Sequence, residues 1–451
     1  MEHRNGRNPV LSPNIHIADP EAHMMPDGSL YVYGSLDERD DMFCSDSYIV
    51  VSTKDQRNWH VHNQSFHSSQ LTWSRNIEPS DISLHDQATK ERAQARAMTY
   101  IKQHGLVGGF RGFEELASSS DPPRLLFAPD AIAANGRYYL SFCCSDDTEG
   151  FVTGDSPKGP FTNPVRLPAT GIDPAIFIDR DGQAYYFWGQ FNASGAKLTP
   201  SMGGIDESTI VHALLTEGNH HFHEGSSMRR FGNVYYFVFA DSSRGKPTCL
   251  GYATSASPLG PFTYQGVIID NAEADPYSWN NHGSIEQVNG SWYIFYHRPS
   301  RCSPLYRRLC VGPITIAADG SIMEVKMTSQ GIGEPFGSSE QIDGWRACAV
   351  SGGIYVGLGP DNRDQLLNAG VGSSAKFRYV QSGHGFQRAI LDTTGDGTIQ
   401  VFMNSLLVDI AHVRGDGKSV LTLTGVGSDR YEMELRVVNG LSIAIRSITL
   451  E

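Results

Sequence analysis

The sequence predicts an all-β protein in which a five-bladed β-propeller is followed by a jelly-roll-like β-sandwich. A motif built around a tight turn and an aromatic strand recurs five times before the last quarter of the chain. The composition, with 47 glycines, 23 prolines and 10% aromatic residues, is typical of short strands joined by turns. The end of the chain alternates polar and apolar residues without a helical period. At 451 residues the chain is too long for one small core, which indicates at least two domains.

Each copy of the motif has an ionisable residue, then an Asn-Gly, Asp-Gly or similar turn, then adjacent or alternate aromatic residues. The ionisable residues are Asp19, Asp130, Asp173, Glu224 and His282. A repeat with this period and with hairpin turns predicts β-blades rather than helical repeats. Equivalent positions of a radial array converge on its axis, so we expect these five side chains to meet in one pocket.

The predicted propeller takes residues 1–330, and its blades end in similar outer turns. Ser156–Phe161 and Ser257–Phe262 share the pattern Ser-Pro-x-Gly-Pro-Phe at the ends of blades two and four. Blade five is expected from His282 to Val311. The sequence pattern that the two turns share is independent evidence for repetition, since Pro and Gly mark turns.

Residues 74–120 are predicted to form a helical insertion between blades one and two. The segment from Asp86 to His104 contains Ala88, Ala93, Ala97, Met98 and Ile101, and it predicts a helix with a narrow apolar face that Asp86 would cap and Gly105 would end. The helix could pack on the propeller rim or frame the mouth of the pocket.

A Gly/Ser/Pro-bearing stretch at 331–339 predicts a linker, and residues 340–451 predict the sandwich. Alternating segments such as 421–424 and 431–437 are separated by turns at Asp396-Gly397 and Asp416-Gly417. No helical signal interrupts them, so a β-sandwich is the simplest interpretation.

The formal net charge of −13 argues against nucleic acid or an anionic membrane as a partner, because phosphate binding needs clustered Lys and Arg. No apolar run approaches the length of a membrane span. Neutral polymers such as carbohydrates remain compatible with this charge.

Seven cysteines, an odd number without metal-ligand spacing, predict reduced thiols. The polar start of the chain does not resemble a signal peptide. Both observations predict a cytoplasmic protein, whereas a leader removed before Met1 would make it a secreted one.

Three of the five repeated residues, Asp19, Asp130 and Glu224, are carboxylic acids in similar contexts. Cleavage of a glycosidic bond needs one carboxylic acid to protonate the leaving oxygen and one carboxylate to activate water or to attack carbon. A third charge nearby helps the acid keep its proton. Alternatively, each Asp caps a turn at the start of a blade.

Asp173 either lines the same pocket to bind substrate or only holds the start of its blade. His282 is expected on the propeller axis, where its imidazole could hold a central cation through water, unless it is an ordinary core histidine. Trp188 could stack on a sugar ring or pack in the core. Of Arg307 and Arg308, one should face inward to bind substrate, since neighbours in a strand face opposite ways; otherwise they form surface ion pairs.

These residues resemble those of glycoside hydrolase family 43, five-bladed propellers that act on arabinose- and xylose-containing polysaccharides. The resemblance covers roughly residues 8–330. It implies that Asp19 is the general base, that Asp130 in Ala-Pro-Asp modulates the pKa of the acid, and that Glu224 in Glu-Gly is the general acid. It also implies a Ca²⁺ or Na⁺ ion beside His282 in His-Gly-Ser, and Arg307, or its neighbour Arg308, as the arginine that contacts substrate.

Within that family, the segments 172–179 and 279–284 are similar to arabinofuranosidases and β-xylosidases that carry an appended β-sandwich. The sandwich loosely resembles a family 6 carbohydrate-binding module, whose ring-stacking residues would be drawn from Trp345, Tyr355, Tyr379 and Phe386. The insertion at 74–120 departs from the short connection usual in the family.

The resulting hypothesis is an inverting, exo-acting glycosidase that releases terminal α-L-arabinofuranose from arabinoxylan- or arabinan-derived chains of the plant cell wall. A β-D-xylosidase is the alternative within the family, since both sugars are pentoses. A propeller that binds carbohydrate without cleaving it is the alternative from another class.

Overall fold

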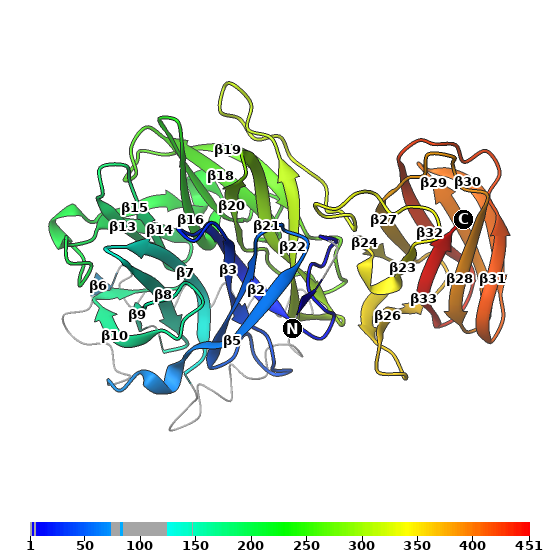
Figure 1. Ribbon diagram of the computed structural model, residues 1–451, viewed down its shortest axis with the longest axis horizontal. Helices are drawn as coiled ribbons and strands as arrows, with labels where there is room; N and C mark the ends of the chain where they lie inside the picture. Colours follow the sequence, from blue (N-terminus) through cyan, green and yellow to red (C-terminus); the bar gives the residue numbers. More distant parts are fainter. Residues whose placement is uncertain (1, 4–5, 74–81, 84–123, 147) are drawn as a thin grey trace.

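The computed structural model describes residues 2–3, 6–73, 82–83, 124–146 and 148–451. These residues form two bodies, a propeller and a smaller β-sandwich that carries the C-terminus (Figure 1). The predicted propeller followed by a sandwich is therefore confirmed. The predicted helical insertion at 74–120 lies outside the described residues, apart from β6 (Ile82–Ser83), which pairs in parallel with β11 (Ala169–Thr170).

Five antiparallel sheets make up the blades. Blade one contains β1 (Glu2–His3), β2 (Ile17–Met24), β3 (Leu30–Leu36), β4 (Ser47–Thr53) and β5 (Trp59–His67). Blade two contains β7 (Leu126–Ala134), β8 (Arg137–Cys144), β9 (Glu149–Gly154) and β10 (Thr162–Leu167). Blade three contains β12 (Ala175–Ile178), β13 (Ala184–Trp188), β14 (Asn192–Lys197) and β15 (Val211–Thr216). Blade four contains β16 (Phe222–Phe231), β17 (Val234–Asp241), β18 (Cys249–Ser255) and β19 (Thr263–Asp270). Blade five contains β20 (Gly283–Val288), β21 (Ser291–Ser300) and β22 (Ser303–Ile314).

Helical structure in the described part of the propeller is limited to single turns. These are η1 (Ser68–Gln70), η3 (Glu207–Thr209) and α3 (Glu217–His220). None of the described helices has the length and apolar character needed to cross a membrane.

The first strands of the blades form the inner ring of the propeller. β2 contacts β7, β7 contacts β12, β12 contacts β16, β16 contacts β20, and β20 contacts β2 again. Residues at the start of these strands therefore lie around one axis, as the repeat predicts.

The start of the chain closes this ring. The Asn8 amide donates to the carbonyl oxygen of Val311 in β22 at 2.7 Å and accepts the backbone N–H of the same residue at 2.9 Å. The backbone N–H of Val10 donates to the carbonyl of Leu309 at 3.1 Å. The N-terminal segment thus pairs with the last strand of blade five.

Apolar cores lie between neighbouring blades rather than inside any one of them. Tyr33 and Phe142 meet between blades one and two, and Phe187 and Phe237 between blades three and four. All seven cysteines lie in the described residues as free thiols, and all but Cys302 are buried. Each blade completes its core only against the next, which accounts for the repeated aromatic strands.

The sandwich consists of two sheets. One is ordered β25 (Tyr355–Leu358), β26 (Asp364–Ala369), β33 (Ile443–Leu450), β28 (Arg388–Thr394) and β31 (Asp416–Thr422), with β23 (Gln341–Asp343) beside β33. The other is ordered β24 (Ala349–Ser351), β27 (Ser374–Val380), β32 (Tyr431–Gly440), β29 (Gly397–Met403) and β30 (Leu406–Val413). The turn η4 (Gly344–Arg346) follows β23, and Phe336, within the predicted linker, packs into the core between the sheets.

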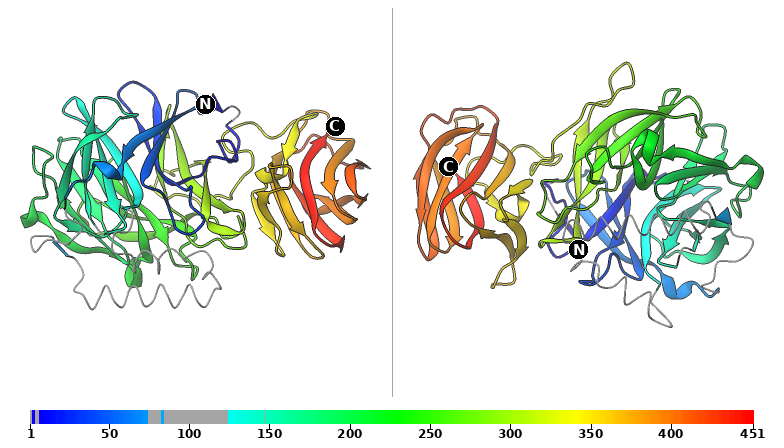
Figure 2. Two further views of the ribbon diagram at one scale, coloured as in Figure 1. Left: turned by 90° about the horizontal axis from the view of Figure 1, so that it is seen from below. Right: turned by 180° about the vertical axis from the view of Figure 1, so that it is seen from behind.

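The two bodies touch through a polar junction (Figure 2). Arg346 Nη1 donates to the carbonyl oxygen of Asn8 at 3.3 Å, and Arg7 Nη2 lies 2.7 Å from Glu340 Oε2. The N–H of Val350 donates to the carbonyl of Glu273 at 2.7 Å. Backbone and arginine contacts of this kind hold the sandwich in a defined place against blades one and five.

Candidate active site

Asp19, Asp173, Glu224 and His282 lie at the starts of four inner strands and are all buried. His282 Nδ1 lies 3.6 Å from Asp19 Oδ1 and 3.5 Å from Asp173 Oδ2. The histidine therefore links carboxyl groups from two different blades. Asp19 and Asp173 both have left-handed backbone, with φ of 52° and 57°, a conformation that Asp tolerates better than most residues and that often marks functional sites.

Arg307 holds the Asp19 carboxylate in place. Its Nη1 lies 2.8 Å from Asp19 Oδ1, while Ser35 donates to Oδ2 at 2.7 Å. The other side of the guanidinium group binds Asp37, with Nε and Nη2 each 2.9 Å from one carboxylate oxygen. This two-point contact fixes the plane of the guanidinium group, and with it the Asp19 oxygen that the arginine meets.

The surroundings of Asp19 favour its ionised form. Burial alone would raise the pKa of this carboxyl group. The positive charge of Arg307, together with the hydrogen bond from Ser35, outweighs burial, so the pKa of Asp19 lies below its ordinary value. Asp19 is therefore a carboxylate at neutral pH, as a base must be.

Glu224 lies in β16 between two side-chain amides. Gln190 Nε2 donates to Oε2 at 2.7 Å, and Asn280 Nδ2 donates to Oε1 at 3.0 Å. The next residue, Gly225, has φ of 80°, and a Cβ atom there would lie 3.1 Å from the His282 ring. A glycine is needed at this position because the backbone beside Glu224 runs directly against the histidine.

Asp173 is the carboxyl group most affected by its neighbours. Burial raises its pKa well above the ordinary value, and the negative charges of Glu224 and then Asp19 raise it further. Its position in the repeat did not decide between lining the pocket and holding the blade. The structure brings it to the site.

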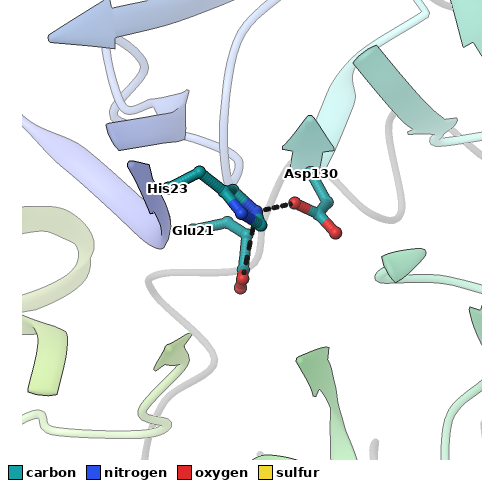
Figure 3. A group of neighbouring side chains, drawn as sticks. All are labelled: Glu21, His23 and Asp130. Carbon is teal, nitrogen blue, oxygen red and sulfur yellow. Dashed lines mark hydrogen bonds and ion pairs between the residues drawn. The ribbon is translucent and has the colours of Figure 1, made fainter. Parts of the chain in front are cut away.

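The Asp130 carboxyl group binds other partners than predicted: it does not join Asp19 and Glu224 directly, although its charge still acts on His282. Asp130 is the fifth residue of β7, after a bulge, whereas Asp19 and Glu224 are the third residues of their strands and Asp173 precedes β12. The Asp130 carboxyl group therefore lies further along its inner strand than the carboxyl groups of Asp19 and Glu224. There Oδ1 lies 2.6 Å from His23 Nε2 (Figure 3). Its Oδ2 accepts the backbone N–H of Ile176 at 2.7 Å.

Comparison with known proteins agrees with this fold. The family model for Glycosyl hydrolases family 43 matches residues 111–322. The chain is a glycoside hydrolase similar to the enzymes of family 43.

Relatives of the chain are named for two related activities. A xylosidase/arabinosidase of Bacteroides ovatus is 28% identical over 70% of this chain and 97% of its own length. An arabinoxylan arabinofuranohydrolase of Bacillus subtilis strain 168 is 25% identical over 97% of this chain and 87% of its own length. Among solved structures, a calcium-free form of CoXyl43, a GH43 beta-xylosidase/alpha-arabinofuranosidase from a compost microbial metagenome in complex with xylotriose, matches with a TM-score of 0.55. It is 25% identical and covers 72% of this chain and 99% of its own.

Two places in the propeller have side chains of the kind that bind metal ions. In the described residues, Glu21, His23 and Asp130 bring ligand atoms within 4.8 Å of one another (Figure 3). However, Arg229 Nη2 lies 2.7 Å from Glu21 Oε1 and 3.5 Å from His23 Nε2. An arginine already supplies the positive charge among these ligands, so the group fits a hydrogen-bonded network better than a metal site.

His282 is the second place. Nδ1 faces Asp19 and Asp173, which leaves Nε2 as the nitrogen free to accept a bond on the other side of the ring. Burial lowers the pKa of His282, so the ring is neutral at neutral pH, as a metal or water ligand must be. Because His282 belongs to no group of three close ligands in the described residues, an ion here fits contact through water rather than direct binding by the protein.

Two predicted substrate-binding residues, Trp188 and Arg308, lie outside the site in the structure. Trp188 is completely buried, with its ring 5.7 Å from that of Tyr186, so it packs in the core and has no free face for a sugar. Arg308 faces away from Arg307 and lies 3.2 Å from Asp364 of the sandwich. Alternation along β22 placed one arginine inward, as predicted, and it is Arg307.

Sequence reasoning missed several residues of the site: Ser35, Asp37, Gln190, Asn280 and His297. Of these, Asn280 carried a usable signal, since it lies two residues before His282 in the same motif. Asp37 directly follows β3 and His297 lies within β21, outside the repeated positions. The pairing of β2 with β3 brings Asp37 near Asp19 within blade one, whereas His297 reaches Asp19 only when blade five closes the ring.

Proposed function

We propose that the chain is an inverting, exo-acting glycosidase that releases terminal α-L-arabinofuranose from chains derived from arabinoxylan or arabinan. The observation that carries the proposal is the difference between two buried carboxyl groups at one end of the axis. Asp19 is held ionised by Arg307, and Glu224 lies beside Asp173, a second carboxyl group. One carboxylate held in its ionised form, and a second carboxyl group that lies beside another acid, are the groups that a base and an acid need.

In the proposed reaction, Asp19 takes a proton from a water molecule whose oxygen attacks the anomeric carbon. Glu224 gives its proton to the glycosidic oxygen as the bond from that oxygen to the anomeric carbon breaks. The amides of Gln190 and Asn280 hold both Glu224 oxygens, so its side chain keeps one orientation through the reaction. The attacking water gives one proton to Asp19, and Glu224 gives one proton to the leaving oxygen. Asp19 then releases its proton to solvent and Glu224 takes one up, so both groups return to their starting states.

We assign the modulating role to Asp173 rather than Asp130. Glu224 is the neighbour whose charge affects Asp173 most strongly after burial. Two carboxylates at close range repel each other, so the site favours a state in which one of the two groups holds a proton. Asp130 instead positions this loop, because it binds the N–H of Ile176, three residues after Asp173.

The two roles predict different pH profiles. We expect Asp173→Asn to move the alkaline limb of kcat/KM to lower pH by about one unit, because the neutral amide no longer keeps a proton on the pair. Asp130→Asn should lower kcat/KM without moving either limb, since it weakens a positioning bond. Initial rates on an aryl glycoside from pH 4 to pH 10 measure both. A limb that moves in Asp130→Asn but not in Asp173→Asn would reverse the assignment.

Arabinofuranose is proposed as the sugar because the relative named as an arabinoxylan arabinofuranohydrolase matches the chain through both domains. β-D-Xylosidase activity is the second candidate, since the Bacteroides ovatus relative is named for both activities. Plant cell-wall polysaccharide is accordingly the proposed partner. The ion proposed beside His282 is Ca²⁺ or Na⁺, held through water, and its charge would orient the imidazole between Asp19 and Asp173.

Activity on two aryl glycosides tests the sugar, and proton NMR of the product tests the stereochemistry. We expect 4-nitrophenyl α-L-arabinofuranoside to be cleaved faster than 4-nitrophenyl β-D-xylopyranoside, and the first-formed arabinose to be the β-anomer. Higher kcat/KM on the xyloside would favour the second candidate. A first-formed α-anomer would mean that Asp19 attacks carbon directly, and the proposal of inversion would fail.

A further inference from the structure

A hollow of about 640 Å³ lies at the junction of the propeller and the sandwich. The propeller contributes Pro13, Asn14 and Arg301 to its wall, and the sandwich contributes Trp345, Asp364 and Gln365. It is separate from the axial cluster, none of whose residues lines it. Sites between domains are frequent places for ligands, because two surfaces supply the wall.

Two polar atoms in this wall are buried without a hydrogen bond among the described residues. Gln365 is 3% exposed, and its Oε1 accepts no bond, while its Nε2 donates to Asp361 Oδ1 at 3.4 Å. Asp364 is 7% exposed, and its Oδ1 accepts no bond either; Arg301 Nε is 3.9 Å away. Asp364 is already ion-paired through Oδ2 with Arg308 Nη2 at 3.2 Å. A buried acceptor without a donor costs free energy, so a hydroxyl group that donates to Gln365 Oε1 or Asp364 Oδ1 would be stabilising.

The backbone makes room for the Gln365 amide. A Cβ atom on Gly359 would lie 1.4 Å from Gln365 Nε2. Glycine at this position therefore lets the amide lie against the turn. The side chain is held in place while Oε1 stays unpaired.

The charges of the wall are nearly balanced. The lining includes three arginines, Arg301, Arg363 and Arg446, and four aspartates, Asp343, Asp361, Asp364 and Asp392. A wall with donors and acceptors of both signs does not select a strongly charged ligand. It suits a neutral molecule that carries many hydroxyl groups, each able to donate to a carboxylate or amide oxygen and to accept from a guanidinium group.

We propose that this junction hollow binds a segment of a neutral polysaccharide, with sugar hydroxyl groups donating to Gln365 Oε1 and Asp364 Oδ1. The identity of the polymer rests on the proposed function, but binding at this place does not depend on catalysis. Because both bodies line the hollow, the ligand would bind only where the sandwich is docked on the propeller.

The test is retention of the full chain in native gels that contain wheat arabinoxylan or arabinan. The parent carries Glu224→Gln, so that the polymer is not cleaved during the run. We expect Gln365→Leu in that parent to bind about tenfold more weakly, since it removes a buried acceptor. Gln365→Glu, which keeps an acceptor oxygen, should retain most of the binding. Gln387→Leu, at an exposed glutamine of the sandwich outside the hollow, is the matched control and should bind like the parent.

A second variant distinguishes a loss of binding from a folding defect. Arg363 is exposed and lines the same hollow, so Arg363→Ala should weaken retention with an unchanged thermal unfolding midpoint. Equal retention of the parent, Gln365→Leu and Arg363→Ala would overturn the proposal, and so would the absence of retention by the parent in both gels. Failure of the proposed function would appear separately, as an absence of hydrolysis by the unmodified chain.

Discussion

Replacing Asp19 with asparagine should reduce kcat on every glycoside by about 10²–10⁴-fold, the usual contribution of a general base. The carboxylate is the group held ionised by Arg307, and an amide cannot take the proton of the attacking water. In addition, an amide nitrogen turned toward Arg307 Nη1 would set two donors against each other. The loss should be similar for good and poor leaving groups, because the base acts on water and not on the departing oxygen.

Asp155→Asn is the matched control for this variant. Asp155 lies on the surface with a side chain 89% exposed, and it forms only a 3.5 Å ion pair with Arg137. Its kcat should equal that of the unmodified chain. If Asp19→Asn retained kcat within about threefold of that value, less than the smallest loss a general base normally causes, Asp19 would not be the base.

Glu224→Gln should show the opposite dependence on leaving group. We expect a loss of about 10²–10⁴-fold on oligosaccharides, whose leaving oxygen needs a proton. With 2,4-dinitrophenyl glycosides the loss should be small, since that leaving group departs without protonation. Rates on the two kinds of substrate, measured for the same preparation, separate an acid from a base.

Glu207→Gln provides the control, since Glu207 is exposed in η3 outside the site. Unchanged turnover of oligosaccharides by Glu224→Gln would remove the catalytic assignment. The chain would then be better explained as a propeller that binds carbohydrate without cleaving it.

The repeat predicted the architecture because each blade needs the same residues: a turn, an aromatic strand and a polar residue at the axis. It also placed Asp19, Glu224 and His282 correctly around that axis. It did not separate Asp130 from Asp173, because depth along an inner strand depends on where the strand begins and on a bulge after Phe127. Spacing to the next turn does not reveal that depth.

Two other outcomes depended on contacts that form only in the folded protein. Alternation along β22 predicted one inward arginine but could not choose between Arg307 and Arg308. The choice follows from partners far away in sequence, Asp37 for the first and Asp364 for the second. Trp188 ends a blade strand in a position that suits a sugar platform, yet the packing of Tyr186 against it closes that surface.

The pairing of Asn8 with Val311 has a consequence for how the protein is made. These residues are 303 positions apart, and they join the first segment of the chain to the last strand of the ring. During synthesis the N-terminal segment cannot pair with β22 until blade five has left the ribosome. The loss of chain entropy on bringing such distant segments together is offset only at that late stage, when their contacts form. Arg307, which orients Asp19, lies in the same last strand, so the catalytic base acquires its charge partner only in the step that closes the ring.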